Sequence, residues 1–394
     1  MVLVTTRPRA DEALFPPHCV SPALKPSAIW FLTYAANMAV WTFVPILARE
    51  ELEIGDTAIG IAVFLYSTAL LLASYIFGRA SDVYGRRMFI LGGLFVSAFA
   101  MAVHFLIADV QSFWMIRFAT GFAVGIFPAA MVDYISRSSG LLGKFSAWGS
   151  LGWGVGALAA GVMAAYFNDL TWAFLLAAGI YFVAFLIALT LPPVEQVKMR
   201  VPLFPVDLIK RNVHYYLPLL VRHAGAMAIW TFWPLYLLDL GASYIWIGII
   251  QFVNPLAQFV FMWLVTDKIR TALLFPVGLV LSAITFITFT MADNVWQLLP
   301  TQILLGVSWG CTYVGALRAV TESSEEKATA AGIFNSTTSM SAILGPLFAT
   351  VIVSFTGLYE STMYFAALMA VISLALYYVL SRRVEASPQV SASG

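Results

Sequence analysis

The chain has 394 residues, of which 61% are hydrophobic and only 10% are charged, and its formal net charge is +1. A soluble protein of this length would carry about a quarter charged residues, so the composition excludes an ordinary soluble domain. The net charge by itself says nothing about nucleic acid, and we expect no nucleic-acid partner. We therefore expect an all-α membrane protein whose surroundings are the lipid bilayer.

Twelve apolar runs of about 20 residues follow one another, and each can cross a hydrocarbon core of about 30 Å as a helix. The runs do not alternate polar and apolar residues, which excludes a transmembrane β-barrel. The predicted transmembrane helices are 27–48, 57–77, 88–107, 112–134, 145–166, 171–191, 215–238, 244–265, 271–291, 295–319, 329–355 and 361–380.

These helices divide the chain into two halves with little sequence outside them. We expect six-helix bundles at 27–191 and 215–381, joined by a cytoplasmic linker at 192–214. The arm at 1–26 is polar and lacks the apolar stretch of a signal peptide. The tail at 382–394 is small and polar, which is typical of disorder.

The first and seventh helices carry nearly the same segment. Met38–Pro45 reads MAVWTFVP and Met227–Pro234 reads MAIWTFWP, with 227 − 38 = 189 residues between them. Gly121 returns as Gly306 at the similar offset of 306 − 121 = 185. A period near half the chain predicts two parallel six-helix repeats, which is an arrangement typical of carriers that rock one half against the other.

Basic residues gather on alternate loops, and the opposite loops are mostly acidic. The positive-inside rule then predicts a multi-pass protein of the cell membrane with both termini in the cytoplasm. The basic loop residues are Arg79, Arg86, Arg87, Arg137, Lys144, Lys198, Arg200, Lys210, Arg211, Lys268, Arg270, Arg382 and Arg383.

The segment Gly78–Arg87, between the second and third predicted helices, reads GRASDVYGRR. It resembles the signature loop of the major facilitator superfamily, G-x-x-x-D-[RK]-x-G-R-[RK], except that Val83 replaces the first cation. The matching positions are Gly78, Asp82, Gly85, Arg86 and Arg87.

Two further motifs support the same resemblance. The fourth helix carries Arg117, Gly121 and Gly125 at four-residue spacing, which is similar to the second motif of the family. Gly152–Gly161 resembles the antiporter motif G-x-x-x-G-P-x-x-G-G, with Ala in place of the Pro and of one Gly. The resemblance implies the fold of this superfamily, its drug/sugar efflux-type branch, and transport by alternating access.

The resemblance also implies that the Gly78–Arg87 loop and Asp133 form a cytoplasmic gate. The residues themselves support contacts of this kind, because Asp82 can face the positive N-terminus of a neighbouring helix and Arg86 is within reach of Asp133. The alternative is a basic anchor that only follows the positive-inside rule. In the second half, Asp267 and Arg318 are candidates for a pair.

Polar side chains inside the predicted helices are costly and usually face a cavity. Gln251, Asn254 and Gln258 share one face of the eighth helix at i, i+3 and i+7, and they either line the substrate path or bind other helices. The other candidates for the cavity are Tyr34, Asn37, Tyr66, Trp230, Gln302 and Asn335.

Three ionisable residues stand out within the predicted helices, namely Arg117, Arg222 and His223. The backbones of Arg117 and Arg222 are expected roughly 16 Å apart along the membrane normal, at 1.5 Å per residue, so they do not clamp one small anion together. The resemblance implies that Arg117 is a structural or coupling residue, and it is also a candidate for the cavity. Arg222 either contacts substrate or extends its side chain to the cytoplasm. His223 either carries a proton or is simply hydrogen-bonded.

No Asp or Glu occupies the middle third of a predicted helix, which argues against an exporter of cationic drugs. We expect a secondary transporter of a small organic solute that is not a cation, working as a monomer. The alternatives are a proton-coupled multidrug or sugar efflux antiporter, with a proton as coupling ion, and more remotely a non-transporting membrane sensor. No catalytic, metal or cofactor motif is recognised, so we do not expect an enzyme.

Overall fold

The computed structural model describes residues 24–46, 48, 56–166, 171–193, 200–242 and 244–385. The described residues are helical, with short loops and no strand. The α-helices of the first half are α1 (Leu24–Ile46), α2 (Asp56–Tyr84), α3 (Arg86–Ala102), α4 (Val110–Val124), α5 (Pro128–Ser138), α6 (Leu142–Tyr166) and α7 (Thr171–Leu189). Those of the second half are α8 (Val206–Asp239), α9 (Tyr244–Leu264), α10 (Thr271–Phe289), α11 (Leu298–Glu322), α12 (Lys327–Thr356) and α13 (Glu360–Glu385).

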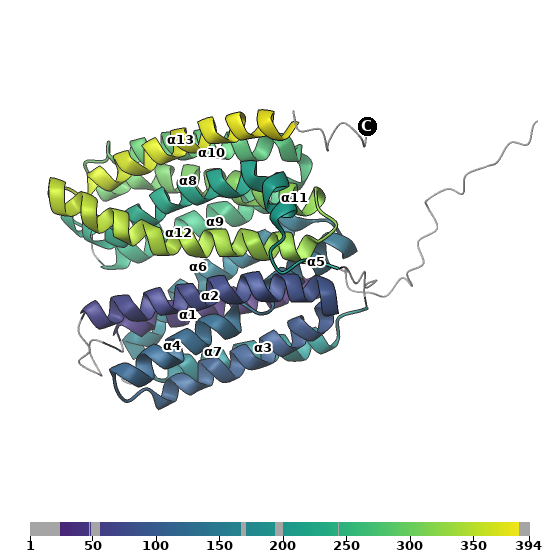
Figure 1. Ribbon diagram of the computed structural model, residues 1–394. Coiled ribbons are helices and arrows are strands. Elements are labelled where there is room, and N and C mark those ends of the chain that lie inside the picture. Colours follow the sequence, from purple (N-terminus) through teal and green to yellow (C-terminus); the bar gives the residue numbers. More distant parts are fainter. Residues whose placement is uncertain are drawn as a thin grey trace, which may run out of the picture.

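The helices lie in two bundles with similar axes, as Figure 1 shows: α1–α7 (purple to teal) in one and α8–α13 (teal to yellow) in the other. Within the first bundle α1 packs on α6 and α7, and α4 packs on α2 and α3. Within the second, α8 packs on α12 and α13, and α11 packs on α9 and α10. The bundles meet along two seams, the α2–α12 seam and the α6–α9 seam.

Glycines allow the closest helix approaches, as small residues do in membrane bundles. A Cβ on Gly121 of α4 would collide with the Tyr66 carbonyl oxygen of α2. A Cβ on Gly306 of α11 would lie 3.0 Å from the Asn254 carbonyl oxygen of α9. The two glycines, which the sequence comparison pairs, thus stand at matching places in the two bundles.

Aspartates form hydrogen bonds across both seams at the same end of the molecule. This end, where α2 stops and α12 starts, also carries most of the described Lys and Arg residues, and we call it the basic end. The opposite end carries Asp109, Asp293 and Glu360, and we call it the acidic end.

Helix boundaries depart from the sequence expectations at three places, and each has a local cause. α2 runs to Tyr84, so Gly78 and Asp82 lie on its last turns rather than in a loop, and only Gly85, with φ 104°, breaks the helix. The predicted fourth helix is two helices, because Pro128 has no N–H to continue the α4 hydrogen bonds. α8 begins at Val206 inside the predicted linker, since Leu208 is buried there although Asp207 and Lys210 are charged.

Among the described residues, nine helical segments are long and apolar enough to cross a membrane, and one of them joins α4 and α5. Most of the predicted arm, 1–23, and most of the predicted tail, 386–394, lie outside the described residues. The helix α13 continues to Glu385, so the first residues of the predicted disordered tail are helical.

Candidate functional site

Asp82 joins the two bundles at the basic end. Its Oδ2 accepts hydrogen bonds from the Thr329 N–H (2.7 Å) and the Thr329 hydroxyl (2.6 Å), and its Oδ1 accepts one from the Ala328 N–H (3.4 Å). These donors belong to the first turn of α12, where unpaired N–H groups and the helix dipole favour an anion. The carboxylate is only 3% exposed, so little water competes for it.

The α2–α12 seam is closed tightly enough to exclude a side chain. A Cβ on Gly78 would lie 2.8 Å from both the Ala328 carbonyl oxygen and the Gly332 Cα. A Cβ on Gly332 would collide with the Ser74 carbonyl oxygen. Two glycines facing each other therefore set the distance at which Asp82 reaches α12.

Asp133 lies between two arginines beside this contact. Arg86 Nε lies 2.9 Å from one carboxylate oxygen, and Arg137 Nε lies 2.5 Å from the other. The guanidinium of Arg137 also donates to the Glu325 carbonyl oxygen, just before α12 (2.7 Å). The ion-pair cluster thus reaches the second bundle through Arg137, which the sequence comparison did not single out.

The α6–α9 seam carries a matching acidic contact. Asp267 accepts hydrogen bonds from the Gly143 N–H (2.9 Å) and the Lys144 N–H (3.0 Å) in the first turn of α6. The expected partner, Arg318, instead donates to the Thr266 carbonyl oxygen (3.0 Å) and pairs with Glu322. That expectation was wrong because the N-terminus of α6 comes from the other bundle and offers Asp267 two free N–H groups.

The remaining arginines of the motif hold the chain that leaves α7. Arg87 donates to the carbonyl oxygens of Leu191 (3.0 Å) and Leu189 (3.1 Å), at the end of α7. Arg79 Nε donates to the carbonyl oxygens of Val201 and Pro202, both at 2.9 Å. Their positions fit a role in fixing the connection between bundles rather than in the seam itself.

The three amide residues on one face of α9 have different surroundings. Gln258 Nε2 donates to Asn254 Oδ1 (2.6 Å), and Gln258 Oε1 accepts from the Ser150 hydroxyl on α6 (3.0 Å). Gln251 lies one turn nearer the acidic end and is partly exposed. In this conformation Gln258 therefore forms a hydrogen bond between helices, which is one of the two interpretations of the stripe, whereas Asn254 bonds to Gln258 within α9.

We expect Gln258→Ala to weaken closure of the α6–α9 seam, because the Ser150 hydroxyl loses its acceptor and Asn254 loses its donor. The closed state should lose about 1 kcal/mol, which raises the open fraction at the basic end about fivefold. Cysteine labelling of Ser146→Cys, at a buried position of α6, measures that fraction. Gln251→Ala is the matched control, and an equal rise in that variant would contradict a specific role for Gln258.

The first bundle holds one arginine deep between its helices. Arg117 is 2% exposed; its Cζ lies 4.3 Å from the centroid of the Tyr66 ring, and its Nε has no hydrogen-bond partner. The Tyr66 ring meets Trp41 at 5.9 Å, and Trp41 is 40% exposed. Asn37 instead accepts from the Tyr181 hydroxyl on α7 (2.8 Å) and so faces its own bundle.

Tyr34 lies nearer the middle of the molecule than Asn37. Its hydroxyl interacts with that of Tyr313 on α11, which belongs to the other bundle. Its ring packs against Trp30 on the same helix, at a centroid distance of 4.9 Å. Neither Tyr181 nor Tyr313 stands out among the 16 tyrosines of the sequence, so their roles became visible only in the fold.

The second bundle also holds a buried arginine. Arg222 Nε donates to the Ser282 hydroxyl on α10 (2.8 Å), and its Cζ lies 5.1 Å from the ring centroids of both Phe286 and Trp309. With 2% exposure it does not extend to the basic end, so that expectation was wrong. Its neighbour His223 stacks on Trp309 at 4.6 Å.

The last three candidates lie in separate places. Trp230 packs beside Trp233 within the second bundle, at a centroid distance of 5.4 Å. Asn335 lies on α12 next to Ser336, whose hydroxyl donates to the Leu71 carbonyl oxygen across the α2–α12 seam (2.9 Å). Gln302 on α11 is fully buried, and neither of its amide atoms has a hydrogen-bond partner.

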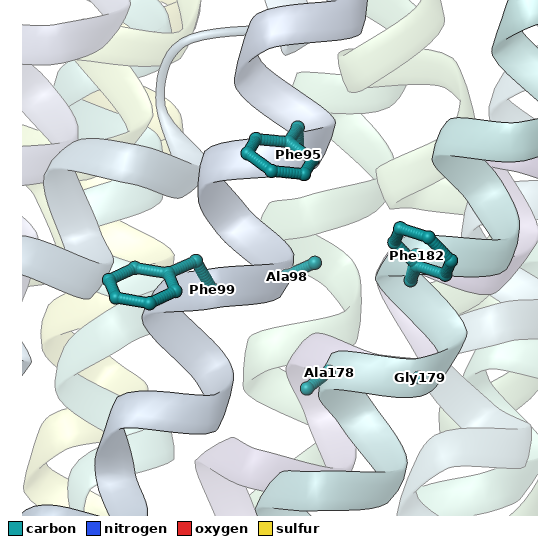
Figure 2. Close-up of a pocket in the computed structure, with 6 residues that line it drawn as sticks. All are labelled: Phe95, Ala98, Phe99, Ala178, Gly179 and Phe182. Carbon is teal, nitrogen blue, oxygen red and sulfur yellow. The ribbon is translucent and has the colours of Figure 1, made fainter.

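An apolar groove between α3 and α7 contains no candidate residue. Figure 2 shows Phe95 and Phe99 on one helix and Phe182 on the other, around a floor of small residues. The exposed fractions of these rings, 52%, 67% and 45%, fit the surface that a membrane protein turns toward lipid. With apolar walls, the groove offers nothing that would recognise a polar solute.

Comparison with known families agrees with this architecture. A family model described as Major Facilitator Superfamily matches residues 27–253 and 215–394. The chain belongs to the major facilitator superfamily. The family prediction is thereby confirmed, and the protein is a multi-pass membrane protein and a transporter of this superfamily.

The individual proteins that resemble this chain share only a small part of its sequence. An uncharacterized MFS-type transporter of Methanocaldococcus jannaschii is 29% identical over 145 residues, which is 34% of this chain and 37% of that protein. The solved structure of the human organic anion transporter MFSD10 (TETRAN) has a TM-score of 0.74 at 15% identity and covers 90% of this chain and 98% of its own. The nucleoside transporter NupG has a TM-score of 0.65 at 14% identity and covers 91% of this chain and 100% of its own. At these identities the two structures show a shared fold.

Proposed function

We propose that this member of the superfamily is a secondary transporter that moves a small organic anion across the membrane by alternating access. Twelve segments cross the bilayer in this proposal, α4 and α5 together forming one. The transporter works as a monomer, and its two bundles are the units that rock against each other. The observation that carries the substrate class is the buried Arg117, whose Nε has no hydrogen-bond partner and which forms no ion pair with a carboxylate of the described residues.

The basic end is placed in the cytoplasm by the positive-inside rule. The conformation described above is then closed to the cytoplasm, with the Gly78–Arg87 motif and Asp133 as the gate. Asp82 and Asp267 support this assignment, because each bridges the two bundles at that end. Breaking both contacts lets the cytoplasmic side open.

A buried cation without a carboxylate partner among the described residues favours an anionic solute. An uncompensated charge in a low-dielectric interior costs several kcal/mol, and an anionic ligand offsets part of that cost. Within the described segments long enough to cross a membrane, Asp and Glu residues lie toward the ends, so a cation finds no carboxylate in the middle. The human structure of similar fold is an organic anion transporter, which supports the same class.

A proton-coupled multidrug or sugar antiporter is the alternative. His223 is the residue of the central region that titrates near neutral pH in water, and it would have to carry the proton. His223 stacks on Trp309 and follows Arg222 directly in the chain, and the positive charge of that arginine disfavours a second cation beside it. The structure gives this alternative less support than transport of an anion.

The test is counterflow in proteoliposomes of purified protein. Vesicles loaded with an unlabelled solute are diluted into the same solute at tracer level, and uptake of label is followed for benzoate, tetraphenylphosphonium and uridine. We expect benzoate to exchange and the cation to be excluded. Preferential exchange of tetraphenylphosphonium would refute the proposed substrate class, while preferential exchange of uridine would assign a neutral solute instead.

A further inference from the structure

The repeat places Gln302 in the second bundle where Arg117 stands in the first. Both residues begin a run with glycines four and eight positions later, and the offset is constant: 302 − 117 = 185 and 306 − 121 = 185. The middle glycines pack on equivalent carbonyl oxygens, Gly121 on that of Tyr66 and Gly306 on that of Asn254.

Tyr66 and Asn254 are themselves related by the repeat, with 254 − 66 = 188. Arg117 contacts Tyr66 in the first bundle. The repeat makes Gln302 and Asn254 the equivalent positions, and so the matching pair, in the other bundle. The first pair is cationic and aromatic, since the Arg117 Cζ lies 4.3 Å from the centroid of the Tyr66 ring. The second pair consists of neutral amides.

Both pairs keep polar atoms without partners. The Nε of Arg117 is buried and unpaired, and so are the nitrogen and the oxygen of the Gln302 amide. Buried polar side chains in native proteins nearly always have a hydrogen-bond partner, and an exception calls for an explanation such as an absent ligand. Gln302 is fully buried, so a solute would reach it when the bundles rearrange around the bound molecule.

Arg222 does not supply a second central charge. Its counterpart in the first bundle is Thr33, since 222 − 33 = 189, and Thr33 is fully buried with its hydroxyl donating to the Trp30 carbonyl oxygen. Arg222 is likewise held inside its own bundle by Ser282 of α10. Arg222 is therefore bound within the second bundle through its Nε, although one of its terminal guanidinium nitrogens has no partner.

We propose that Arg117 with Tyr66 and Gln302 with Asn254 form the two halves of one binding site, whose ligand is a monoanion that also carries a neutral hydrogen-bonding group. The carboxylate of the ligand binds Arg117, its apolar body lies along Tyr66 and Trp41, and its hydroxyl or carbonyl group binds the Gln302 amide. A dianion is disfavoured, because its second charge would meet a neutral amide. This inference rests on the proposed anion transport and narrows it.

Four matched solutes test the site: benzoate, 4-hydroxybenzoate, terephthalate and 4-hydroxybenzamide. Affinities are measured on purified protein by ligand-induced shifts of melting temperature and by calorimetry. The wild type should bind 4-hydroxybenzoate most tightly, roughly tenfold better than benzoate, because a buried amide gains a partner. Terephthalate and 4-hydroxybenzamide should bind more weakly than 4-hydroxybenzoate.

Substitutions then test which residue binds each end of the ligand. Gln302→Leu should equalise benzoate and 4-hydroxybenzoate, and Arg117→Gln should favour 4-hydroxybenzamide. Exchanging the two residues, Arg117→Gln with Gln302→Arg, should restore the preference for 4-hydroxybenzoate, which would bind in the reverse orientation. Arg222→Gln, which removes the other buried cation, is the control and should leave the order of the four affinities unchanged.

The outcomes separate this inference from the proposed function. Equal binding of terephthalate and 4-hydroxybenzoate, or an unchanged order of affinities in Gln302→Leu, would overturn the two-part site and leave anion transport standing. Wild-type protein that binds 4-hydroxybenzamide better than all three acids would overturn both. If Gln302→Arg lowers the melting temperature too far for the exchange, Gln302→Leu and Arg117→Gln alone decide the result.

Discussion

Asp82→Asn is expected to slow transport by about tenfold or more and to leave the protein open at its basic end. Asn keeps the shape of the side chain but removes the charge that faces the first turn of α12, where Thr329 and Ala328 donate. A charge-assisted contact of this kind, buried at a helix N-terminus, contributes about 1–2 kcal/mol. Its loss shifts the population toward the conformation open to the cytoplasm.

The shift is measured by maleimide labelling of Ser74→Cys, at a buried position of α2 beside Gly332, after Cys19→Ser and Cys311→Ser remove the native thiols. The matched control is Asp109→Asn. Asp109 also accepts a backbone hydrogen bond at a helix N-terminus, from the Ser112 N–H (2.7 Å), but that helix belongs to its own bundle. Equal labelling of the Asp82 and Asp109 variants would contradict a gating role for Asp82.

Gly332→Val is expected to have the larger effect and to abolish transport. Its Cβ would occupy the place of the Ser74 carbonyl oxygen, and its methyl groups would meet α2 near Gly78. Backbone cannot give way as a flexible side chain does, so the helices must separate by an ångström or more, and overpacking of this kind typically costs about 1–3 kcal/mol. The closed conformation should become inaccessible while each bundle remains folded.

Transport assays and the Ser74→Cys labelling test this expectation together, with Gly92→Val as control. A Cβ on Gly92 would have no heavy atom within 4 Å, although that residue too lies on an α-helix of the first bundle. Normal transport by Gly332→Val would show that the α2–α12 seam need not close during the cycle. Loss of transport in both variants would point to a general effect of replacing glycine.

The sequence allowed a contact to be predicted where the charge of a residue limits the groups that it can bind. Asp82 can satisfy its charge at a helix start, and Thr329 is the first residue of the predicted eleventh helix, so their contact could be anticipated in kind. The pairing of Arg86 with Asp133 follows similarly from opposite charges near one membrane surface. The family could be predicted because its signature motif combines glycine, acid and base at fixed spacing.

Partners that are backbone groups or come from the other bundle were not predictable. Arg87 binds the carbonyl oxygens at the end of α7, and every residue offers such an oxygen. Gln258 meets Ser150 across the α6–α9 seam, at a sequence separation of 108 residues. The break between α4 and α5 was missed because hydropathy continues smoothly through Pro128, whereas the missing N–H interrupts the helix.

The two acidic contacts at the basic end have a kinetic consequence. If both seams must separate in one step, the free energies of the Asp82 and Asp267 contacts add, and their contributions to the lifetime of the closed state multiply. Two contacts that each contribute about 1 kcal/mol, or about fivefold, would together lengthen that lifetime about 30-fold. A carrier built in this way is governed by two modest contacts rather than by one strong one, so that each closure remains reversible.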